Sequence, residues 1–349
     1  MTGMTGEGCS GTAYPRSTYP RATRRIRHTT LLASLVALLA VAGCMAVPEA
    51  QPGQSTAPTS VLSTPVGLTL ATGMTQHALE VDGRIRMYRV YRPEGAVTSA
   101  PLVVMLHGGL GSARSAEQAY GWDVVADRDQ VVILYPDAVG EAWNVGGGCC
   151  GTAAAERVDD VKFLTRAIAN VQAQAPIDSK RIYTTGMSAG GMMAYRLACE
   201  TDLLAAIGPV AATMLGDCPN PAPMSVIAVN GTADRVVPYA GSLPDAVAHI
   251  DGPPVPDVIR SWRTTARCGG EVISVEGAVT TSVAQCPSDR TVKLVTILGG
   301  GHEWPGVESS GPLDASPTAT ETPPATPSTG TGTVDATAEI WAFFAKHHR

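Results

Sequence analysis

Apolar residues in the central part of the chain occur in short, nearly uninterrupted runs, which are separated by longer segments of mixed composition. Six runs read as strands, at 102–106, 131–135, 181–185, 205–210, 226–229 and 294–298. Because they lack the polar alternation of a half-exposed strand, they predict strands that are buried on both faces. The intervening segments are long enough for helices. The pattern therefore predicts an α/β fold, with a mostly parallel central sheet and helices on both faces.

Other patterns complete the expected elements. Residues 77–81 and 85–91 alternate between apolar and polar positions across Asp82-Gly83, which predicts a β-hairpin. Apolar residues at helical spacing predict two amphipathic helices, at 157–173 and 334–348. Asp159 and Asp160 lie at the head of the first helix, where we expect their carboxylates to interact with the N-terminal amides.

The N-terminal segment has the features of an export signal. Arginines precede the apolar stretch 31–40, which is too short to span a bilayer comfortably. The next residues, Val41-Ala42-Gly43-Cys44, resemble the lipobox of bacterial lipoproteins, in which the cysteine becomes the lipidated first residue of the mature protein. We therefore expect a signal peptide over 1–43 and a lipid anchor at Cys44 on the outer face of the bacterial cell membrane. Ordinary secretion with an unmodified Cys44 is the alternative.

Composition divides the rest of the chain into a stalk and one domain. Residues 44–70 are rich in Pro, Ser, Thr, Gly and Gln, which predicts a flexible stalk. Residues 71–349 provide material for one large domain rather than two. Within this domain, 309–332 is dense in Thr, Pro, Ser and Ala, and we expect a disordered surface excursion there.

The charge balance excludes some classes of partner. The whole chain has a formal net charge of −6, and residues 1–43 carry five Arg against one Glu, which leaves −10 for the remainder. Such an acidic domain argues against nucleic acid or an anionic membrane surface as its ligand. The membrane contact that we expect is therefore the lipid at Cys44.

Six cysteines remain outside the leader and the lipobox, an even number in a chain with an export signal. This predicts disulfides, and proximity in sequence favours two pairs: Cys199 with Cys218, and Cys268 with Cys286. Cys149 and Cys150 would then be an adjacent pair, either bonded to each other or partly free. No cysteine or histidine has the spacing of a zinc finger or a zincin, and we expect neither a metal nor a cofactor.

The segment Gly186-Met187-Ser188-Ala189-Gly190 follows the apolar run 181–185 and precedes a helical pattern. It matches the G-x-S-x-G nucleophile elbow, in which a serine stands on a sharp turn between a strand and a helix. The glycines relieve the crowding of that turn, so the hydroxyl is exposed at the end of a parallel sheet. Ser188 is therefore predicted to be a nucleophile.

A serine nucleophile needs a base, and the base needs an acid that orients it. In α/β-hydrolases the acid and then the histidine follow the serine, in loops after later strands. Asp234 fits the acid because it follows the strand 226–229, although a local turn role is the alternative. His302 fits the base because its Gly-rich loop directly follows the strand 294–298, with a structural role in that turn as the alternative.

Attack on an ester carbonyl creates an oxyanion, which needs preorganised N–H donors. The Gly-rich segment 107–112 follows the strand 102–106 and is able to turn backbone amides toward the serine. We predict the N–H groups of Ala189 and Gly109 as the two donors, with Leu110 as the alternative to Gly109. His107 is predicted to hold this loop in place.

The chain carries an ordered set of short motifs: Leu-His-Gly-Gly at 106–109, Trp-Asn at 143–144, Gly-Gly-Cys-Cys-Gly at 147–151, Val-Asp-Asp-Val at 158–161, Gly-Met-Ser-Ala-Gly-Gly-Met-Met at 186–193, Gly-Thr-Ala-Asp at 231–234 and Gly-Gly-His-Glu-Trp-Pro-Gly at 300–306. Over about 76–349 it resembles the polyhydroxybutyrate depolymerase and feruloyl esterase family of α/β-hydrolases. The resemblance implies an α/β-hydrolase fold, in which Ser188 is the nucleophile, Asp234 the acid and His302 the base. The Thr- and Pro-rich excursion and the lack of an appended polymer-binding domain depart from the family pattern, and they disfavour insoluble polyester as a substrate.

The expected function is that of an exported, membrane-anchored serine esterase. Its substrates would be short-chain or hydroxycinnamoyl esters, or soluble hydroxybutyrate oligomers, cleaved through an acyl-enzyme on Ser188. Trp143 and Trp304 are candidates for the wall of the substrate pocket, with core packing as an equal alternative. A cell-envelope acyltransferase with the same triad and a non-catalytic binding lipoprotein are the other hypotheses. Because all three triad residues are present, the sequence argues against a lipoprotein that only binds its ligand.

Overall fold

The computed structural model describes residues 70–95, 99–242, 250, 252–306 and 334–349. All of them belong to the unit Ser63–Arg349. The predicted signal peptide, Cys44 and nearly all of the predicted stalk lie outside the described residues, as does the predicted excursion 309–332. No helix in the described part of the chain is both long and apolar enough to cross a bilayer.

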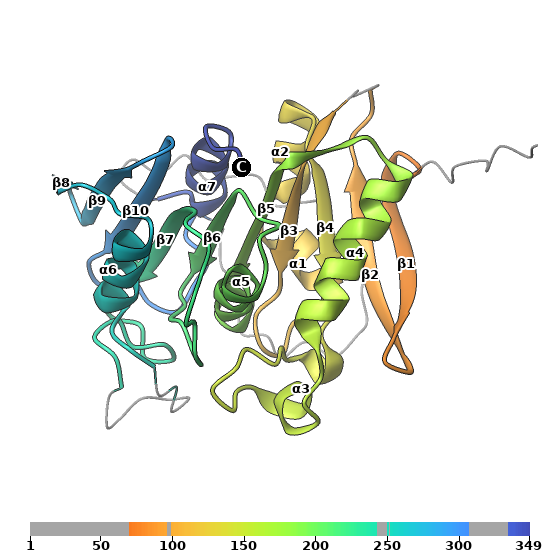
Figure 1. Ribbon diagram of the computed structural model, residues 1–349, viewed down its shortest axis with the longest axis horizontal. Helices are drawn as coiled ribbons and strands as arrows, with labels where there is room; N and C mark the ends of the chain where they lie inside the picture. Colours follow the sequence, from red (N-terminus) through yellow and green to blue (C-terminus); the bar gives the residue numbers. More distant parts are fainter. Residues whose placement is uncertain (1–69, 96–98, 243–249, 251, 307–333) are drawn as a thin grey trace, which may run out of the picture. The chain divides into compact units, whose positions relative to one another are not determined.

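One sheet of ten strands runs through the described residues, in the order β1-β2-β4-β3-β5-β6-β7-β10-β9-β8. The strands are β1 (Gly73–Val81), β2 (Arg84–Arg92), β3 (Ala100–Leu106), β4 (Val132–Pro136), β5 (Ile177–Met187), β6 (Ala206–Val210), β7 (Ser225–Gly231), β8 (Glu271–Glu276), β9 (Val279–Cys286) and β10 (Arg290–Ile297). Neighbours from β4 through β10 are parallel, whereas the strands outside them pair antiparallel. Figure 1 shows this parallel centre between the edge strands β1 and β8. The six predicted strands and the predicted hairpin are therefore confirmed, except that Leu298, which is predicted within the last buried strand, lies just after β10 and is 72% exposed.

Helices cover both faces of the sheet, as the pattern predicts. They are α1 (Ala113–Ala119), α2 (Trp122–Asp129), α3 (Gly151–Ala155), α4 (Asp160–Gln174), α5 (Ala189–Glu200), α6 (Val255–Thr265) and α7 (Ala336–Phe344). Successive side chains of a strand point to opposite faces, so Leu102 and Val104 join the core beneath α4, α5 and α6. Val103 and Met105 join the core beneath α1, α2 and α7. Figure 1 shows α4, α5 and α6 together on one face of the sheet.

The edge strand β8 is not predicted by the sequence pattern. Its apolar residues Val272, Ile273 and Val275 are 72%, 59% and 69% exposed, so this strand is not stabilised by the burial of apolar side chains. Instead, β8 is paired through its backbone with β9, over a register that joins Glu271 to Ala284 at one end. A pattern of buried positions cannot reveal a strand whose two faces are both exposed.

Asp160 has a different role from the one predicted. Asp159 is the N-cap of α4 and accepts a hydrogen bond from the Lys162 amide at 2.9 Å, as expected for a carboxylate at a helix start. Asp160 is fully buried and forms an ion pair with Arg86 at 2.7 Å. It also accepts a hydrogen bond from the Asn144 amide at 2.8 Å. Burial raises the pKa of the Asp160 carboxyl, and the Arg86 charge opposes that rise.

Three disulfides are present among the described residues. Cys199 at the end of α5 is joined to Cys218, and Cys268, just past α6, is joined to Cys286 of β9. These are the two pairs that sequence proximity favours. Cys149 and Cys150, which the sequence leaves open, are bonded to each other.

Candidate active site

The predicted nucleophile lies on a sharp turn between β5 and α5. Ser188 has φ 54° and ψ −119°, a conformation that L-residues rarely adopt. Its amide donates to the Val210 carbonyl at 2.9 Å, and its carbonyl accepts from the Met192 amide at 2.9 Å. These bonds to β6 and α5 hold the strained residue in place, and such strain is typical of a nucleophile elbow.

A glycine is required directly after this turn. A Cβ placed on Gly190 would lie 2.3 Å from the Leu106 carbonyl oxygen and 2.6 Å from that of His107. Both oxygens are backbone atoms and have little freedom to move away. The elbow therefore packs tightly against the end of β3, the strand from which the predicted oxyanion loop begins.

Asp234 lies in the loop after β7, and each of its carboxylate oxygens has a separate role. Oδ1 accepts hydrogen bonds from the amides of Val236 and Val237, both at 2.8 Å. Oδ2 lies 2.8 Å from Nδ1 of His302. The carboxylate thus fulfils the local turn role and contacts the predicted base at the same time. Its side chain is only 1% exposed, so both interactions are shielded from water.

His302 lies in the loop after β10, with a side chain that is 19% exposed. Because Asp234 is a carboxylate acceptor, the contact at 2.8 Å favours a proton on Nδ1 of His302. The other ring nitrogen, Nε2, then carries the lone pair that accepts a proton from a hydroxyl. This arrangement is the one that a general base requires.

The loops that carry Asp234 and His302 are bonded to each other. The Thr232 amide donates to the Ile297 carbonyl at 3.0 Å, and the Ala233 amide donates to the Gly300 carbonyl at 2.9 Å. A Cβ on Gly231 would lie 2.2 Å from the Gly300 oxygen, so no larger residue fits between the loops. The backbone therefore fixes the positions of the acid and the base relative to each other.

Strand order brings all three predicted residues to one edge of the sheet. Ser188 follows β5, Asp234 follows β7, and His302 follows β10, and these strands run parallel within the order β5-β6-β7-β10. Parallel strands end at the same edge, so the residues that follow them meet there. Ligands of open α/β sheets bind at this carboxyl edge.

His107 holds the loop after β3, as predicted. Its imidazole is 1% exposed, and burial lowers its pKa. The neutral ring accepts from the Ala138 amide through Nε2 at 3.1 Å, and it donates through Nδ1 to the Gly108 carbonyl at 2.7 Å. Both nitrogens are therefore occupied by structural bonds, which leaves no role for His107 as a second base.

The same loop passes beside the nucleophile. A Cβ built on Gly108 would lie 3.7 Å from the Ser188 Cβ. The Leu110 amide donates to the Glu141 carbonyl at 2.9 Å, so it is not free to bind an oxyanion, and the alternative role predicted for Leu110 is wrong. Among the described residues, the Gly109 amide has no acceptor. The Ala189 amide lies in the first turn of α5, where helix amides have no acceptor within the helix.

Trp143 and Trp304 are core residues, and the prediction that they line a substrate pocket is wrong. They are 0% and 3% exposed. The Trp143 indole donates to the His107 carbonyl at 2.9 Å and supports the predicted oxyanion loop. The Trp304 indole donates to the Thr337 hydroxyl at 2.9 Å, inside the core beneath α7. Each indole therefore supports a loop of the site from the protein interior.

Tyr120 is a residue of this region that the sequence does not reveal. It is the C-cap of α1, and its ring centroid lies 4.5 Å from that of Trp304. Its hydroxyl donates to Sδ of Met187 at 3.6 Å, directly before Ser188. Nothing in the local sequence predicts these contacts, because their partners are far away along the chain.

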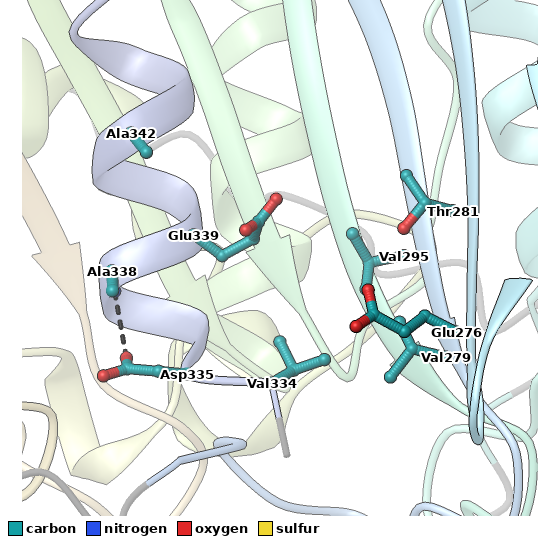
Figure 2. Close-up of a pocket in the computed structure, with 9 residues that line it drawn as sticks. All are labelled: Glu276, Val279, Thr281, Val295, Val334, Asp335, Ala338, Glu339 and Ala342. Atoms are coloured by element: carbon teal, nitrogen blue, oxygen red, sulfur yellow. Dashed lines mark hydrogen bonds between the residues drawn. The ribbon is translucent and has the colours of Figure 1, made fainter. Parts of the chain in front are cut away.

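A cavity of about 540 Å³ lies between the outer strands of the sheet and α7 (Figure 2). Its lining residues are Glu276, Val279, Thr281, Val295, Val334, Asp335, Ala338, Glu339 and Ala342. Two of its carboxylates are engaged, since Asp335 accepts from the Ala338 amide at 2.9 Å and Glu339 pairs with Lys293. Neither Ser188, Asp234 nor His302 lines this cavity, which is therefore separate from the candidate site.

Known proteins of similar sequence are esterases and depolymerases by name. A relative in Nocardia uniformis subsp. tsuyamanensis, NocK, carries a provisional esterase name and is 32% identical over 320 residues, covering 80% of this chain and 90% of its own. Feruloyl esterase B of Piromyces equi is 32% identical over 221 residues, covering 58% of this chain and 40% of its own. Poly(3-hydroxyalkanoate) depolymerase C of Paucimonas lemoignei is 28% identical over 134 residues, covering 37% of this chain and 31% of its own. This chain thus spans less than half of the latter two relatives.

Among solved structures, the chain matches LpqC, a poly(3-hydroxybutyrate) depolymerase from Bordetella parapertussis. It is 19% identical with a TM-score of 0.45, covering 66% of this chain and 85% of its own. The family model described as Esterase PHB depolymerase matches residues 86–262, about half of the chain. The protein belongs to this family, the esterase PHB depolymerases, and it is a carboxylic ester hydrolase with the α/β-hydrolase fold.

Proposed function

We propose that the protein is an exported serine esterase that uses Ser188 as nucleophile, His302 as base and Asp234 as acid. The observation that carries the proposal is the 2.8 Å contact between Asp234 and His302, at the sheet edge where the strained Ser188 lies. The family match covers Ser188 and Asp234 but ends before His302, so the assignment of the base depends on this geometry.

The reaction proceeds in two steps. His302 takes the hydroxyl proton of Ser188 as the oxygen attacks the ester carbonyl, and it then passes that proton to the departing alcohol. The products of this step are the free alcohol and an acyl-enzyme. Water then loses a proton to His302 and attacks the acyl-enzyme, and the imidazolium returns that proton to Oγ of Ser188 as the carboxylic acid is released. Asp234 holds the imidazole tautomer and stabilises the imidazolium that forms in each step.

The oxyanion of each tetrahedral intermediate binds to the amides of Gly109 and Ala189. The approach of Gly108 to Ser188 supports this assignment, because it brings the β3 loop alongside the nucleophile. The engagement of the Leu110 amide leaves Gly109 as the donor from that loop. Two such donors stabilise charge that develops only in the transition state, and that is where an enzyme gains rate.

The substrates are short-chain or hydroxycinnamoyl esters, or soluble hydroxybutyrate oligomers. The names of the feruloyl esterase and the depolymerase among the relatives support this range. The protein is anchored by lipid at Cys44 to the outer face of the cell membrane, or secreted. An acyltransferase that passes the acyl group to a sugar hydroxyl is the second candidate function, because the same triad serves water and sugar acceptors.

The test is a substrate profile of the purified protein with p-nitrophenyl esters of increasing chain length, methyl ferulate and hydroxybutyrate oligomers. We expect turnover of at least one class and none above background in Ser188→Ala. Added trehalose separates the two functions: faster ester loss with an acylated sugar product supports transfer, and an unchanged rate supports hydrolysis. Activity of Ser188→Ala at the wild-type level would contradict the proposed mechanism.

A further inference from the structure

Tyr120 contacts the loop that carries the proposed base. Its ring lies against Trp304 with a centroid distance of 4.5 Å and an angle of 30° between the ring planes. Trp304 is two residues beyond His302 and is buried. An aromatic contact of this kind adds to the burial of both rings and restricts how far each one moves. Tyr120 is therefore packed directly against the loop that carries His302.

A second connection runs through the backbone of Tyr120. The Thr337 hydroxyl donates to the Tyr120 carbonyl at 2.6 Å, and it accepts from the Trp304 indole at 2.9 Å. Thr337 lies in the first turn of α7 and is 6% exposed, so both bonds are shielded from water. A single hydroxyl thus ties the end of α1, the His302 loop and α7 together.

A third connection reaches the proposed nucleophile. The Tyr120 hydroxyl donates to Sδ of Met187 at 3.6 Å, and Met187 is the last residue of β5, directly before Ser188. Burial raises the pKa of the Tyr120 phenol to about 12, so the group stays neutral over the working range of an esterase. It therefore remains a hydrogen-bond donor to Met187.

We propose that Tyr120 is a positioning residue, which sets the distance between His302 and Ser188 by contacting the segments that carry them. The inference depends on the proposed triad. The two backbone bonds between the loops fix His302 relative to Asp234, whereas β5 is joined to β7 only through the intervening β6. Tyr120 connects the base loop directly to β5, within the core beneath α1, α2 and α7. Since an error of 1 Å between reacting groups costs on the order of a hundredfold in rate, such a connection matters for chemistry.

The experiment compares three variants with the wild-type protein. Tyr120→Leu removes the aromatic ring and the hydroxyl, whereas Tyr120→Phe keeps the ring on Trp304 and removes only the bond to Met187. Tyr91→Phe is the matched control, because Tyr91 also donates a hydroxyl hydrogen bond, to Asp127 at 2.8 Å. Its backbone pairs with Ile133 near the start of β4, whereas the candidate site lies at the carboxyl edge of the sheet. Each protein is assayed for kcat, KM, the thermal midpoint and the rate constant for phosphonylation of Ser188 by a fluorophosphonate.

We expect Tyr120→Leu to lower kcat and the phosphonylation rate constant about tenfold or more, with KM within about twofold. Tyr120→Phe should restore both within about threefold, and Tyr91→Phe should match the wild type. A purely structural residue would lower the thermal midpoint and the reactive fraction but leave the rate constant of the reactive molecules unchanged. That result with Tyr120→Leu would overturn the inference.

Two further outcomes are distinguishable. If Tyr120→Leu does not fold, Thr337→Val decides, because it removes the two hydrogen bonds of the hydroxyl and keeps a side chain of similar size. An unchanged phosphonylation rate constant in Thr337→Val then overturns the inference. If the wild-type protein itself neither hydrolyses esters nor reacts with the fluorophosphonate, the proposed function fails, and the inference fails with it.

Discussion

Oδ2 of Asp234 lies 2.8 Å from Nδ1 of His302, although 68 positions separate the two residues in the sequence. The contact arises because β7 and β10 are parallel neighbours, so the loops that follow them leave the sheet side by side. The other carboxylate oxygen, Oδ1, accepts hydrogen bonds from the amides of Val236 and Val237. The imidazole is thus oriented by a group that is itself fixed by the backbone.

Replacing Asp234 with asparagine should remove activity without removing the fold. The Asn carbonyl oxygen is able to accept the two amide bonds that now reach Oδ1, so the turn is retained. The amide group no longer holds His302 in the tautomer that accepts a proton at Nε2, and kcat should fall by about 10³- to 10⁴-fold. Steady-state kinetics and a circular dichroism melt measure the two effects. A fully active Asp234→Asn protein would show that the acid is misassigned.

Gly190→Ala should damage the elbow. The added Cβ would lie 2.3 Å from the Leu106 carbonyl oxygen, so the turn or the end of β3 must shift. We expect a loss of about 3 kcal/mol or more in the free energy of unfolding, together with loss of esterase activity. Gly270→Ala is the matched control, since nothing lies within 4 Å of a Cβ at that position. Urea unfolding of both variants provides the comparison, and equal stability of the two would contradict the packing described for Gly190.

Asp123 should make stability depend on pH. Burial raises the pKa of this carboxyl to about 7 from its usual 3.8, although the Tyr135 hydroxyl donates to it at 2.7 Å and opposes the rise. Between pH 4 and 7 the folded protein therefore holds a proton that the unfolded chain has lost, and the contribution of this group to stability falls as pH rises. Asp123→Asn keeps an acceptor for Tyr135 and removes the titration.

The stability gained by Asp123→Asn over the wild type should therefore be small at pH 4 and larger at pH 8. Urea unfolding at pH 4, 6 and 8 measures this difference, and other titrating groups cancel because they are common to both proteins. A difference that is constant from pH 4 to 8 would rule out a raised pKa at Asp123.

The bond between Cys199 and Cys218 should contribute to stability by restricting the unfolded chain. The cysteines are separated by 19 positions, and closing a loop of this length is worth roughly 3 kcal/mol in the chain-entropy model. Cys199→Ser should lower the thermal midpoint accordingly, with little effect on kcat at 25 °C because the bond lies outside the triad. Peptide mapping without reduction checks the pairing, and a midpoint equal to that of the wild type would contradict the expected contribution.

The sequence predicts the centre of the molecule better than its edges. Each parallel strand contains a short apolar run where both faces of the sheet are covered, and this pattern is visible without the structure. Ser188, Asp234 and His302 each follow such a strand, so their positions follow from strand order. Trp143 and Trp304 are predicted as pocket residues because of their aromatic rings, but residue type does not say whether an indole faces a substrate or the core.

Tyr120 escapes prediction for a related reason. Its carbonyl bonds to Thr337 across 217 positions of sequence, and its hydroxyl bonds to Met187 across 67. Contacts of such separation depend on how α1, α7 and the His302 loop pack together, and no short motif records that packing.

The most direct test of the proposed mechanism is the identity of the residue that carries the covalent intermediate. The wild-type protein is reacted with a fluorophosphonate, digested and mapped by tandem mass spectrometry, with Ser188→Ala treated in parallel. We expect one stoichiometric adduct on Ser188, none in Ser188→Ala, and loss of ester hydrolysis in step with labelling. An adduct on another residue that abolishes hydrolysis, with Ser188 unmodified, would contradict the proposed mechanism.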